Sequence, residues 1–490
     1  MASLQEYTMG MDFTAKTFAG LEDVLAAELK NIGVSDIQVI KRGVQFRGEK
    51  EDMYKANYLC RTALRVLRPI GVFEVSDDVQ LYEKVKKINW QEVFRLDQTF
   101  NINAHVFYSQ LDHEQYVALR TKDAIVDQFR EATGKRPWVA KEDADVYIDV
   151  HISQDVCTIS LDSSGESLHK RGYRIDADKA PINEVLAAGM IKLTDWRGDK
   201  DFYDPMCGSA TIPIEAAMLA MNIPAAYYRK HFSFMNWADY DEALFKKIKE
   251  EADLEMGELD CHIFASDRSE KAVGIAKRNL RNAGLHKDID VRVSYFDNIQ
   301  PENKGGILVF NPPYGKRMEE RGEIRDLYSG IGDVLKQNFS GFEAWIITSN
   351  MDVAKFIGLR PSAKIVLYNG PLESRFIKFE LYEGSKKAKN NPQWEEKGEY
   401  GNRDSQREDK EDYRKRKVKN TAGKFSRNDD RKKPDREYDK PKWKDKGDRS
   451  STDNKDSSYS RRPSLGKPEK TQYTGDGKRG SRKKRPRIND

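Results

Sequence analysis

Apolar and polar positions in the N-terminal third of the chain alternate in two different ways. Residues 20–31 place apolar side chains three or four positions apart, which predicts an amphipathic helix. Period-two alternation at residues 99–107 and 146–161 predicts a strand and a hairpin. Helices and mostly antiparallel strands are therefore mixed, and we expect an α+β region made of one unit at residues 1–55 and another at 56–165.

From about residue 168 the pattern changes to apolar strands that alternate with longer amphipathic helices, which predicts a doubly wound α/β sheet. Helices are expected at 183–193, 212–221, 270–283 and 322–339, and strands at 201–204, 262–267, 290–295, 307–310 and 344–348. A short turn at 369–372 joins the last two strands, so this Rossmann-like sheet should end in an antiparallel hairpin. That ending is typical of a methyltransferase-like sheet rather than a dinucleotide-binding one. The predicted domain covers residues 166–384.

Composition divides the chain into two parts of opposite charge. Residues 385–490 contain 35 Lys and Arg, 20 Asp and Glu, and very few aliphatic side chains, whereas the first 384 residues carry 50 basic and 60 acidic ones. The final segment cannot bury enough apolar surface to offset its ordering entropy, so we expect a disordered basic tail. The tail suits phosphate backbones, and the acidic remainder would need local basic patches to bind a polyanion.

The four cysteines are far apart in the sequence and form no CxxC pair: Cys60, Cys157, Cys207 and Cys261. Neither a zinc site nor a disulfide framework is indicated. No apolar run reaches 18 residues, and the N-terminus lacks a signal-peptide pattern. We expect a cytoplasmic protein without a metal or a membrane contact.

The loop at residues 204–211 follows a predicted strand and opens a predicted helix. Small side chains let backbone N–H groups approach a ligand closely, and a helix N-terminus favours negative charge. The loop has the single glycine Gly208, with neither a GxGxxG pattern nor a Walker lysine. It therefore suits a carboxylate-bearing ligand better than a pyrophosphate.

Two further strand ends carry polar side chains. Asp267 closes the second strand of the predicted sheet, where ribose hydroxyls are usually held. Asp297 and Asn298 follow the third strand and could bond an adenine. Each alone is more often a helix N-cap. Their occurrence at successive strand tips, after the loop that begins at Asp204, favours a nucleoside site.

The tetrapeptide Asn311-Pro312-Pro313-Tyr314 comes directly after the fourth strand. An amine conjugated to a base ring is a poor nucleophile because its lone pair is delocalised. The Asn311 side chain and the Pro312 carbonyl could accept both amine hydrogens and turn the nitrogen towards a methyl donor, while Tyr314 offers a ring for stacking. The alternative, a strand that merely ends in a proline turn, explains less of the pattern.

These motifs occur in a fixed order, at residues 169–174, 180–184, 204–211 and 311–317. With them the chain resembles the class I S-adenosylmethionine-dependent RNA methyltransferases that carry an N-terminal THUMP domain, especially bacterial large-subunit rRNA guanine-N2 methyltransferases. The resemblance extends to about residue 383. It implies a ferredoxin-like unit and an RNA-binding THUMP domain ahead of the catalytic domain, S-adenosylmethionine as the cofactor, and a monomer that acts on RNA.

The resemblance also implies roles for single residues. The methionine part of the cofactor would be held by the loop, the ribose by the second strand tip, the adenine by the third and the target amine by the fourth, with a tyrosine stacked on the base. In that order the residues are Asp204, Cys207, Gly208, Ser209 and Thr211; Asp267 and Arg268; Asp297 and Asn298; Asn311 and Pro312; and Tyr314.

A basic stretch between the two predicted domains is a candidate RNA contact, formed by Lys170, Arg171, Tyr173 and Arg174. The alternative is a solvated turn, the default for a run of charges. Arg317, three residues past the tetrapeptide, is a similar candidate for the backbone beside a flipped nucleotide.

Two departures from the family pattern stand out. Ala210 follows Gly208-Ser209 where the family usually has a second glycine, and a methyl group there is tolerable if φ is negative. Larger family members carry a second methyltransferase domain after the first, where this chain has its basic tail, so a second methylation is not expected.

The predicted reaction is methylation of guanine N2 in 23S rRNA. The alternatives are guanine N2 in tRNA, adenine N6 in RNA or DNA, and a glutamine amide in a protein. A hypothesis from another functional class is that the chain is a non-catalytic RNA-binding assembly factor.

Overall fold

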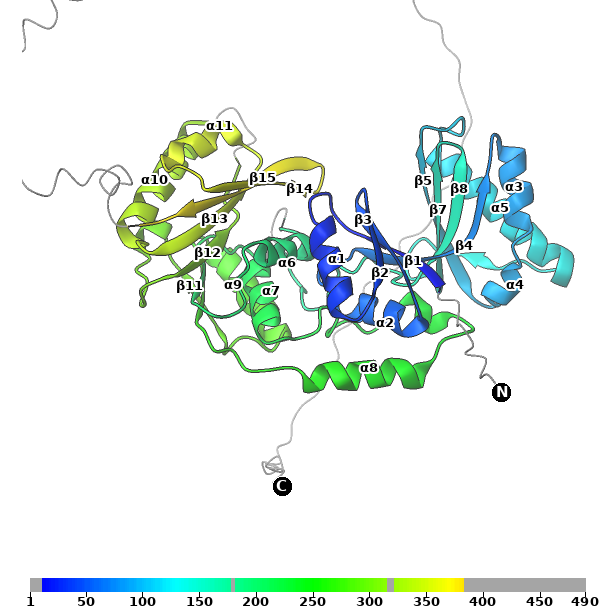
Figure 1. The fold of residues 1–490 in the computed structure, drawn as a ribbon, viewed down its shortest axis with the longest axis horizontal. Coiled ribbons are helices and arrows are strands. Elements are labelled where there is room, and N and C mark those ends of the chain that lie inside the picture. The colour runs from blue at the N-terminus through cyan, green and yellow to red at the C-terminus, as the bar shows by residue number, and fades with distance from the viewer. Residues whose placement is uncertain (1–10, 178–180, 315–320, 383–490) are drawn as a thin grey trace, which may run out of the picture. The chain divides into compact units, whose positions relative to one another are not determined.

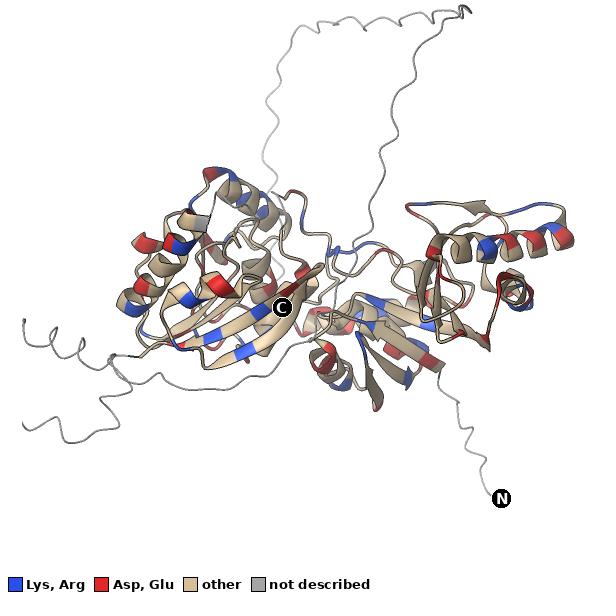
Figure 2. Ribbon diagram, turned by 90° about the horizontal axis from the view of Figure 1, so that it is seen from above, with Lys and Arg blue, Asp and Glu red and all other residues tan. Residues whose placement is uncertain are grey.

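The computed structural model describes residues 11–177, 181–314 and 321–382. The predicted tail at 385–490 and the candidate Arg317 lie outside the described residues. Acidic and basic residues are interspersed along the helices of the described part (Figure 2). No helix within these ranges is long and apolar enough to cross a membrane.

The N-terminal region is built around one mixed sheet of eight strands (Figure 1). Its elements are β1 (Met11–Lys16), α1 (Glu22–Asn31), β2 (Asp36–Ile40), β3 (Gly43–Gly48), α2 (Lys50–Leu59), β4 (Arg65–Glu74), α3 (Asp78–Lys86), α4 (Trp90–Val93), β5 (Thr99–Phe107), α5 (Glu114–Thr133), β6 (Trp138–Val139), β7 (Val146–Ser153) and β8 (Val156–Asp162). The strand order is β2-β3-β1-β4-β8-β7-β5-β6. Strand β4 pairs with β1 on one side and β8 on the other, so it joins the two halves of the region.

Local sequence explains several of these boundaries. Glu49 and Asp52 form a capping box that begins α2. Gly134, with φ of 73°, ends α5 in the left-handed conformation that glycine adopts without strain. Helix α2 continues across residue 55, the predicted end of the first N-terminal unit. The limits of the domains stay a prediction.

The second region is a seven-stranded sheet flanked by helices (Figure 1). Its elements are α6 (Glu184–Leu193), β9 (Phe202–Asp204), α7 (Thr211–Ala220), β10 (Ile263–Asp267), α9 (Glu270–Asn282), β11 (Ile289–Val293), η2 (Phe296–Asn298), β12 (Gly306–Phe310), α10 (Arg321–Asn338), β13 (Phe342–Thr348), α11 (Met351–Ala354), η4 (Lys355–Ile357), β14 (Ala363–Asn369) and β15 (Leu372–Glu380). Between α7 and β10 the chain forms η1 (Ser233–Asn236) and α8 (Glu242–Leu254), whose buried residues Phe234, Phe245 and Ile248 belong to the core of the N-terminal region.

The strand order of this sheet is β11-β10-β9-β12-β13-β15-β14. The first five strands are parallel, whereas β15 runs antiparallel to both β13 and β14. The carboxyl ends of the parallel strands therefore lie at one edge. The predicted α/β class, the Rossmann-like sheet and its antiparallel terminal hairpin are confirmed.

Alternating side chains of β12 show how the sheet separates two cores. Ile307 and Val309 belong to a core shared with α6, α7 and α9, whereas Leu308 and Phe310 belong to one shared with α10 and α11. All four are fully buried. A strand covered by helices on both faces carries a continuous apolar run because both of its faces are inside.

Candidate active site

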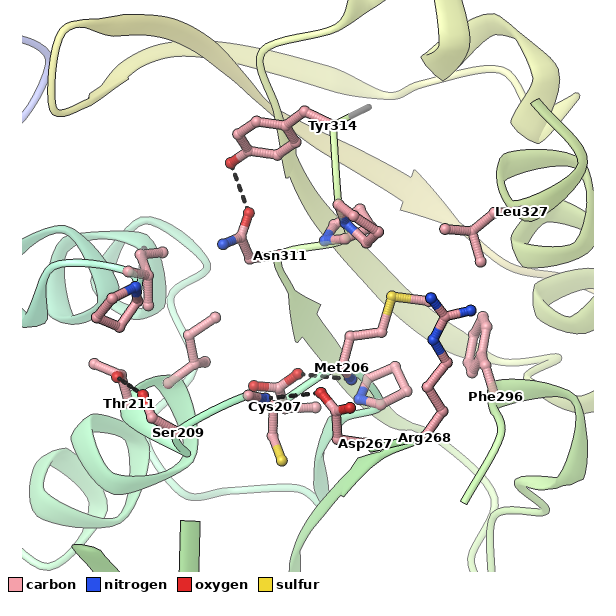
Figure 3. Close-up of a pocket in the computed structure, with 18 of the residues that line it drawn as sticks. Met206, Cys207, Ser209, Thr211, Asp267, Arg268, Phe296, Asn311, Tyr314 and Leu327 are labelled. Carbon is pink, nitrogen blue, oxygen red and sulfur yellow. Dashed lines mark hydrogen bonds between the residues drawn. The ribbon is translucent and has the colours of Figure 1, made fainter. Parts of the chain in front are cut away.

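A cavity of about 650 Å³ lies at the carboxyl edge of the parallel strands (Figure 3). Its walls come from the tips of β9, β10 and β12, from η2, and from the turn between β14 and β15. Eleven of the twelve residues predicted to bind cofactor or to act in catalysis line it: Asp204, Cys207, Gly208, Ser209, Thr211, Asp267, Arg268, Asp297, Asn311, Pro312 and Tyr314. The twelfth, Asn298, lines a neighbouring cavity of about 250 Å³.

The loop after β9 is folded tightly against the tip of β10. The Cys207 N–H donates to the Ser266 carbonyl at 2.9 Å, and the Gly208 N–H donates to Asp267 Oδ2 at 3.1 Å. Gly208 has a positive φ of 53°. Ala210 also lies in the left-handed region, with φ of 64° and ψ of 28°, so the condition of a negative φ, under which a methyl group is tolerable at this position, is not met. The turn into α7 imposes the same left-handed backbone that a glycine would adopt freely.

Asp204, at the end of β9, is a buried carboxylate with an unused acceptor. Its side chain is 1% exposed, and Oδ1 accepts the Met206 N–H at 3.1 Å, whereas Oδ2 has no hydrogen-bond partner. Burial raises the pKa of Asp204 well above its ordinary value, and the nearby charge of Asp267 adds to this increase. A buried acceptor without a partner is unfavourable, and an ammonium group in the cavity would satisfy it.

Asp267, at the end of β10, is held in place by two backbone donors. Oδ1 accepts the Ser269 N–H at 2.9 Å, and Oδ2 accepts the Gly208 N–H. A carboxylate can accept about four hydrogen bonds, so Asp267 can still accept from a pair of hydroxyls. Phe296 and Arg268 lie beside each other on the same side of the cavity (Figure 3) and provide an apolar face and a cation there.

Asn311 follows the last residue of β12, and the tetrapeptide that it begins is braced from two sides. The Tyr314 hydroxyl donates to Asn311 Oδ1 at 2.6 Å, and the Asn350 side chain donates from Nδ2 to the Tyr314 carbonyl at 3.1 Å. Figure 3 shows the Tyr314 ring reaching back over Asn311. Burial raises the pKa of Tyr314, so its hydroxyl keeps its proton at neutral pH.

The basic stretch before α6 is not a phosphate-binding surface as a whole. Arg171 and Tyr173 are buried at 1% and 0% exposure, and both bond to Oε1 of Glu215, at 3.4 and 2.9 Å. Arg174 is partly buried and donates to the Thr211 hydroxyl. The interpretation of Arg171 and Tyr173 as RNA contacts is not supported, because an internal carboxylate holds them inside the protein.

Lys170 differs from its neighbours. Its side chain is 57% exposed and pairs with Glu166 at the surface. It is the one member of the predicted RNA-contacting group, among the residues that the structure describes, that clearly faces solvent.

Five further lining residues lie inside motifs named from the sequence without a role of their own: Pro181, Ile182, Pro205, Met206 and Pro313. The residues that the sequence did not point to are Ile212, Ser294, Tyr295, Phe296, Leu327, Asn369, Pro371 and Leu372. Phe296 comes directly before Asp297, and its position was a usable signal. The turn residues Asn369 and Pro371 carried none, since only the antiparallel return of β15 brings them to this edge.

Comparisons with known proteins agree with this architecture. The family described as "RMKL-like, methyltransferase domain" matches residues 171–378, "THUMP domain" matches 75–162, and "RlmL ferredoxin-like domain" matches 12–67. A protein of Synechocystis sp., provisionally named an RNA methyltransferase, is 37% identical over 76% of this chain and 97% of its own length. The chain belongs to the THUMP-containing, RMKL-like methyltransferases.

Two further relatives refine the picture. The ribosomal RNA large subunit methyltransferase K/L of Syntrophotalea carbinolica is 37% identical over 76% of this chain, which spans about half of that protein (54%). A crystal structure of a provisionally named methyltransferase complexed with SAH has a TM-score of 0.69 and 30% identity, covering 77% of this chain and all of its own.

The cofactor of the chain is S-adenosylmethionine. The cavity suits this molecule, since it combines an unpaired buried carboxylate for an ammonium, a fixed carboxylate for ribose hydroxyls and an aromatic ring for adenine.

Proposed function

We propose that this chain transfers a methyl group from S-adenosylmethionine to the N2 amine of a guanine in large-subunit ribosomal RNA. The assignment of an amine as the methyl acceptor rests on one observation: Asn311 and Pro312 line the same cavity as Asp204 and Asp267. The choice of RNA as the substrate rests on the THUMP match and on the relative named as a ribosomal RNA large subunit methyltransferase. The choice of guanine as the methylated base rests on the resemblance to guanine-N2 methyltransferases.

The geometry of the cavity supports a role for each of these residues. Asp204 Oδ2 would pair with the ammonium of the methionine part, the backbone of the Gly208 loop would approach its carboxylate, and Asp267 would hold the ribose. Phe296 would lie against the adenine and Asp297 would reach its edge. When bound, S-adenosylmethionine supplies an electrophilic methyl group on a positively charged sulfur.

The chain's contribution to the transfer is to orient the amine. Asn311 Oδ1 and the Pro312 carbonyl would accept one amine hydrogen each, which directs the nitrogen lone pair into the cavity. The nitrogen lone pair would form the new N–C bond as the bond between sulfur and the methyl group breaks, with that bond's electron pair left on a neutral sulfur. The methylated nitrogen would then release one proton to solvent. The Tyr314 ring would stack on the base, which must leave its own stack to enter the cavity.

Other substrates share this chemistry. Guanine N2 in tRNA and adenine N6 in RNA or DNA present the same flat amine, so the tetrapeptide alone does not distinguish them. The basic tail, counted from the sequence, and the THUMP match favour RNA. We propose that the enzyme acts as a monomer, with rRNA preferred over tRNA.

Transfer of a labelled methyl group to separate samples of rRNA, tRNA, DNA and protein tests the proposal. The nucleic acids should come from cells that lack the gene, so that the target is unmethylated. We expect label in large-subunit rRNA, and we expect Asn311→Ala to lower the rate by about 10²–10³-fold while RNA affinity changes little. Label in DNA alone, or full activity of Asn311→Ala, would refute the proposed reaction.

A further inference from the structure

The Tyr314 hydroxyl links two asparagines that are 58 positions apart in the sequence. It donates its proton to Asn311 Oδ1 at 2.6 Å and accepts a hydrogen bond from Asn369 Nδ2 at 3.4 Å. Asn311 directly follows the last residue of β12, whereas Asn369 is the last residue of β14. The three side chains form one chain of hydrogen bonds from the terminal hairpin to the amine-binding residue.

The direction of this chain has a chemical consequence. A tyrosine hydroxyl has one proton to donate, and an amide NH₂ group can only donate. Because Asn369 offers its NH₂ group to the hydroxyl oxygen, the hydroxyl proton is left for Asn311. The group of Asn311 that meets it must then be the carbonyl Oδ1 and not Nδ2.

Orientation matters because the two ends of an asparagine amide have nearly the same shape. Rotating the Asn311 amide by half a turn would exchange Oδ1 for an NH₂ group, which repels the hydrogens of a target amine. Oδ1 has two lone pairs, so the Tyr314 proton can occupy one while the amine occupies the other. The hydrogen-bond chain favours the orientation that can bind an amine.

We propose that Asn369 is a positioning residue, which acts through the Tyr314 hydroxyl to hold the Asn311 amide with its oxygen towards the target amine. This inference rests on the proposed function, since it assigns Asn311 to the amine.

The position of Asn369 suits this role because its backbone is fixed. It pairs with Leu372 at the end of the β14–β15 ladder, and Gly370, with φ of 62°, allows the tight turn between them. Strand β15 is in turn paired along β13. The antiparallel hairpin thereby carries a donor to the edge of a parallel site. Burial raises the pKa of Tyr314, and its contacts with Asn369 and Ser374 oppose that increase, in keeping with donors around the phenol oxygen.

Four variants of the full-length enzyme test the proposal: Asn369→Ala, Asn369→Asp, Tyr314→Phe and the double variant Tyr314→Phe/Asn369→Ala. Asn369→Asp keeps the shape but offers an acceptor in place of the donor. Tyr314→Phe keeps the ring and removes only the hydroxyl. Tyr368→Phe is a matched control, since that hydroxyl lies on the same hairpin and, within the described ranges, bonds to Glu373 at the surface, at 3.3 Å.

We expect kcat on unmethylated rRNA to fall about tenfold in each of the three single variants, the effect of losing one hydrogen bond. KM for the rRNA, the dissociation constant of S-adenosylmethionine and the melting temperature should change little, and Tyr368→Phe should resemble wild type. The double variant should also lose about tenfold rather than a hundredfold, because the two residues act through one chain.

Three results would overturn the inference. Unchanged kcat in Asn369→Ala or Asn369→Asp would show that the donor is dispensable. A multiplied loss in the double variant would show that the two residues act separately. A higher kcat in Tyr314→Phe would show that the hydroxyl blocks Asn311 instead of orienting it. In each case the proposed function stands if Asn311→Ala lowers the rate of transfer by about 10²–10³-fold, and it fails if Asn311→Ala keeps full activity.

Discussion

Asp204→Asn should make the cofactor-free enzyme more stable and the cofactor-loaded enzyme less stable. In the wild type a carboxylate with 1% exposure has one oxygen bonded to the Met206 N–H and one without a partner. Leaving a buried acceptor unpaired costs about 1–3 kcal/mol, and more if it is charged. The amide removes the charge but leaves its own N–H₂ group without a partner, so we expect a net gain of about 1 kcal/mol.

The sign of the pH dependence follows from the raised pKa of Asp204. The folded state holds this proton more tightly than the unfolded chain, so the destabilising effect is absent below the ordinary value of 3.8 and develops as pH rises above it. The advantage of Asp204→Asn should therefore be present at neutral pH and vanish in acid. In a domain of this size, 1 kcal/mol raises the melting temperature by about 2–4 °C.

Cofactor should reverse the order of stability. At a hundredfold excess over its dissociation constant, S-adenosylmethionine stabilises the wild type by about 2.7 kcal/mol. Removing the partner of a buried charge costs about 3–5 kcal/mol, so the variant should gain almost nothing at the same concentration. Thermal denaturation with and without cofactor measures both effects. A variant that is less stable without cofactor, or that keeps the full cofactor-induced shift, would refute this account of Asp204.

Three further outcomes are expected. Arg171→Met should lower the free energy of unfolding by about 3–5 kcal/mol because it leaves Glu215 buried without its cation. Lys170→Ala should leave denaturation curves unchanged and weaken RNA binding in a filter assay. The opposite pattern would restore Arg171 as an RNA contact. Calorimetry should show wild-type affinity for S-adenosylmethionine falling as pH is lowered, since the raised pKa of Asp204 makes binding release a proton, and Asp204→Asn should lack this dependence. Deleting residues 385–490 should weaken RNA binding and flatten its dependence on salt without changing which base is modified; a changed base would show that the tail selects the target.

The catalytic sheet could be predicted because its signals are local. Each parallel strand is a short apolar run, and polar residues such as Asp204, Asp267 and Asn311 follow directly where those runs end. Since parallel strands end at one edge, the order of motifs already implied that these side chains share a cavity.

Features that depend on distant partners were not predictable in this way. The run of basic residues around Arg171 is typical of a solvated turn. Glu215, which holds the Arg171 side chain inside the protein, lies 44 positions away in the sequence. The contact of Asn369 with Tyr314 spans 55 positions.

Among the elements that were not predicted, β4 and α8 were missed for different reasons. In β4 the pairing with β8 shifts register between Pro69 and Gly71, and this irregularity breaks the period-two pattern. Helix α8 had a usable signal, because Phe245, Ile248 and Ala252 are its buried residues and stand at helical spacing.

Nucleoside mass spectrometry of purified rRNA and tRNA, from cells with and without the gene, tests whether this chain methylates guanine N2 in large-subunit rRNA. We expect that N2-methylguanosine in large-subunit rRNA is lost without the gene, returns with the wild-type gene and does not return with Asn311→Ala. Loss of N6-methyladenosine instead, or loss confined to tRNA, would contradict the proposed substrate. An unchanged set of nucleosides in both RNAs would contradict the claim that this chain methylates RNA.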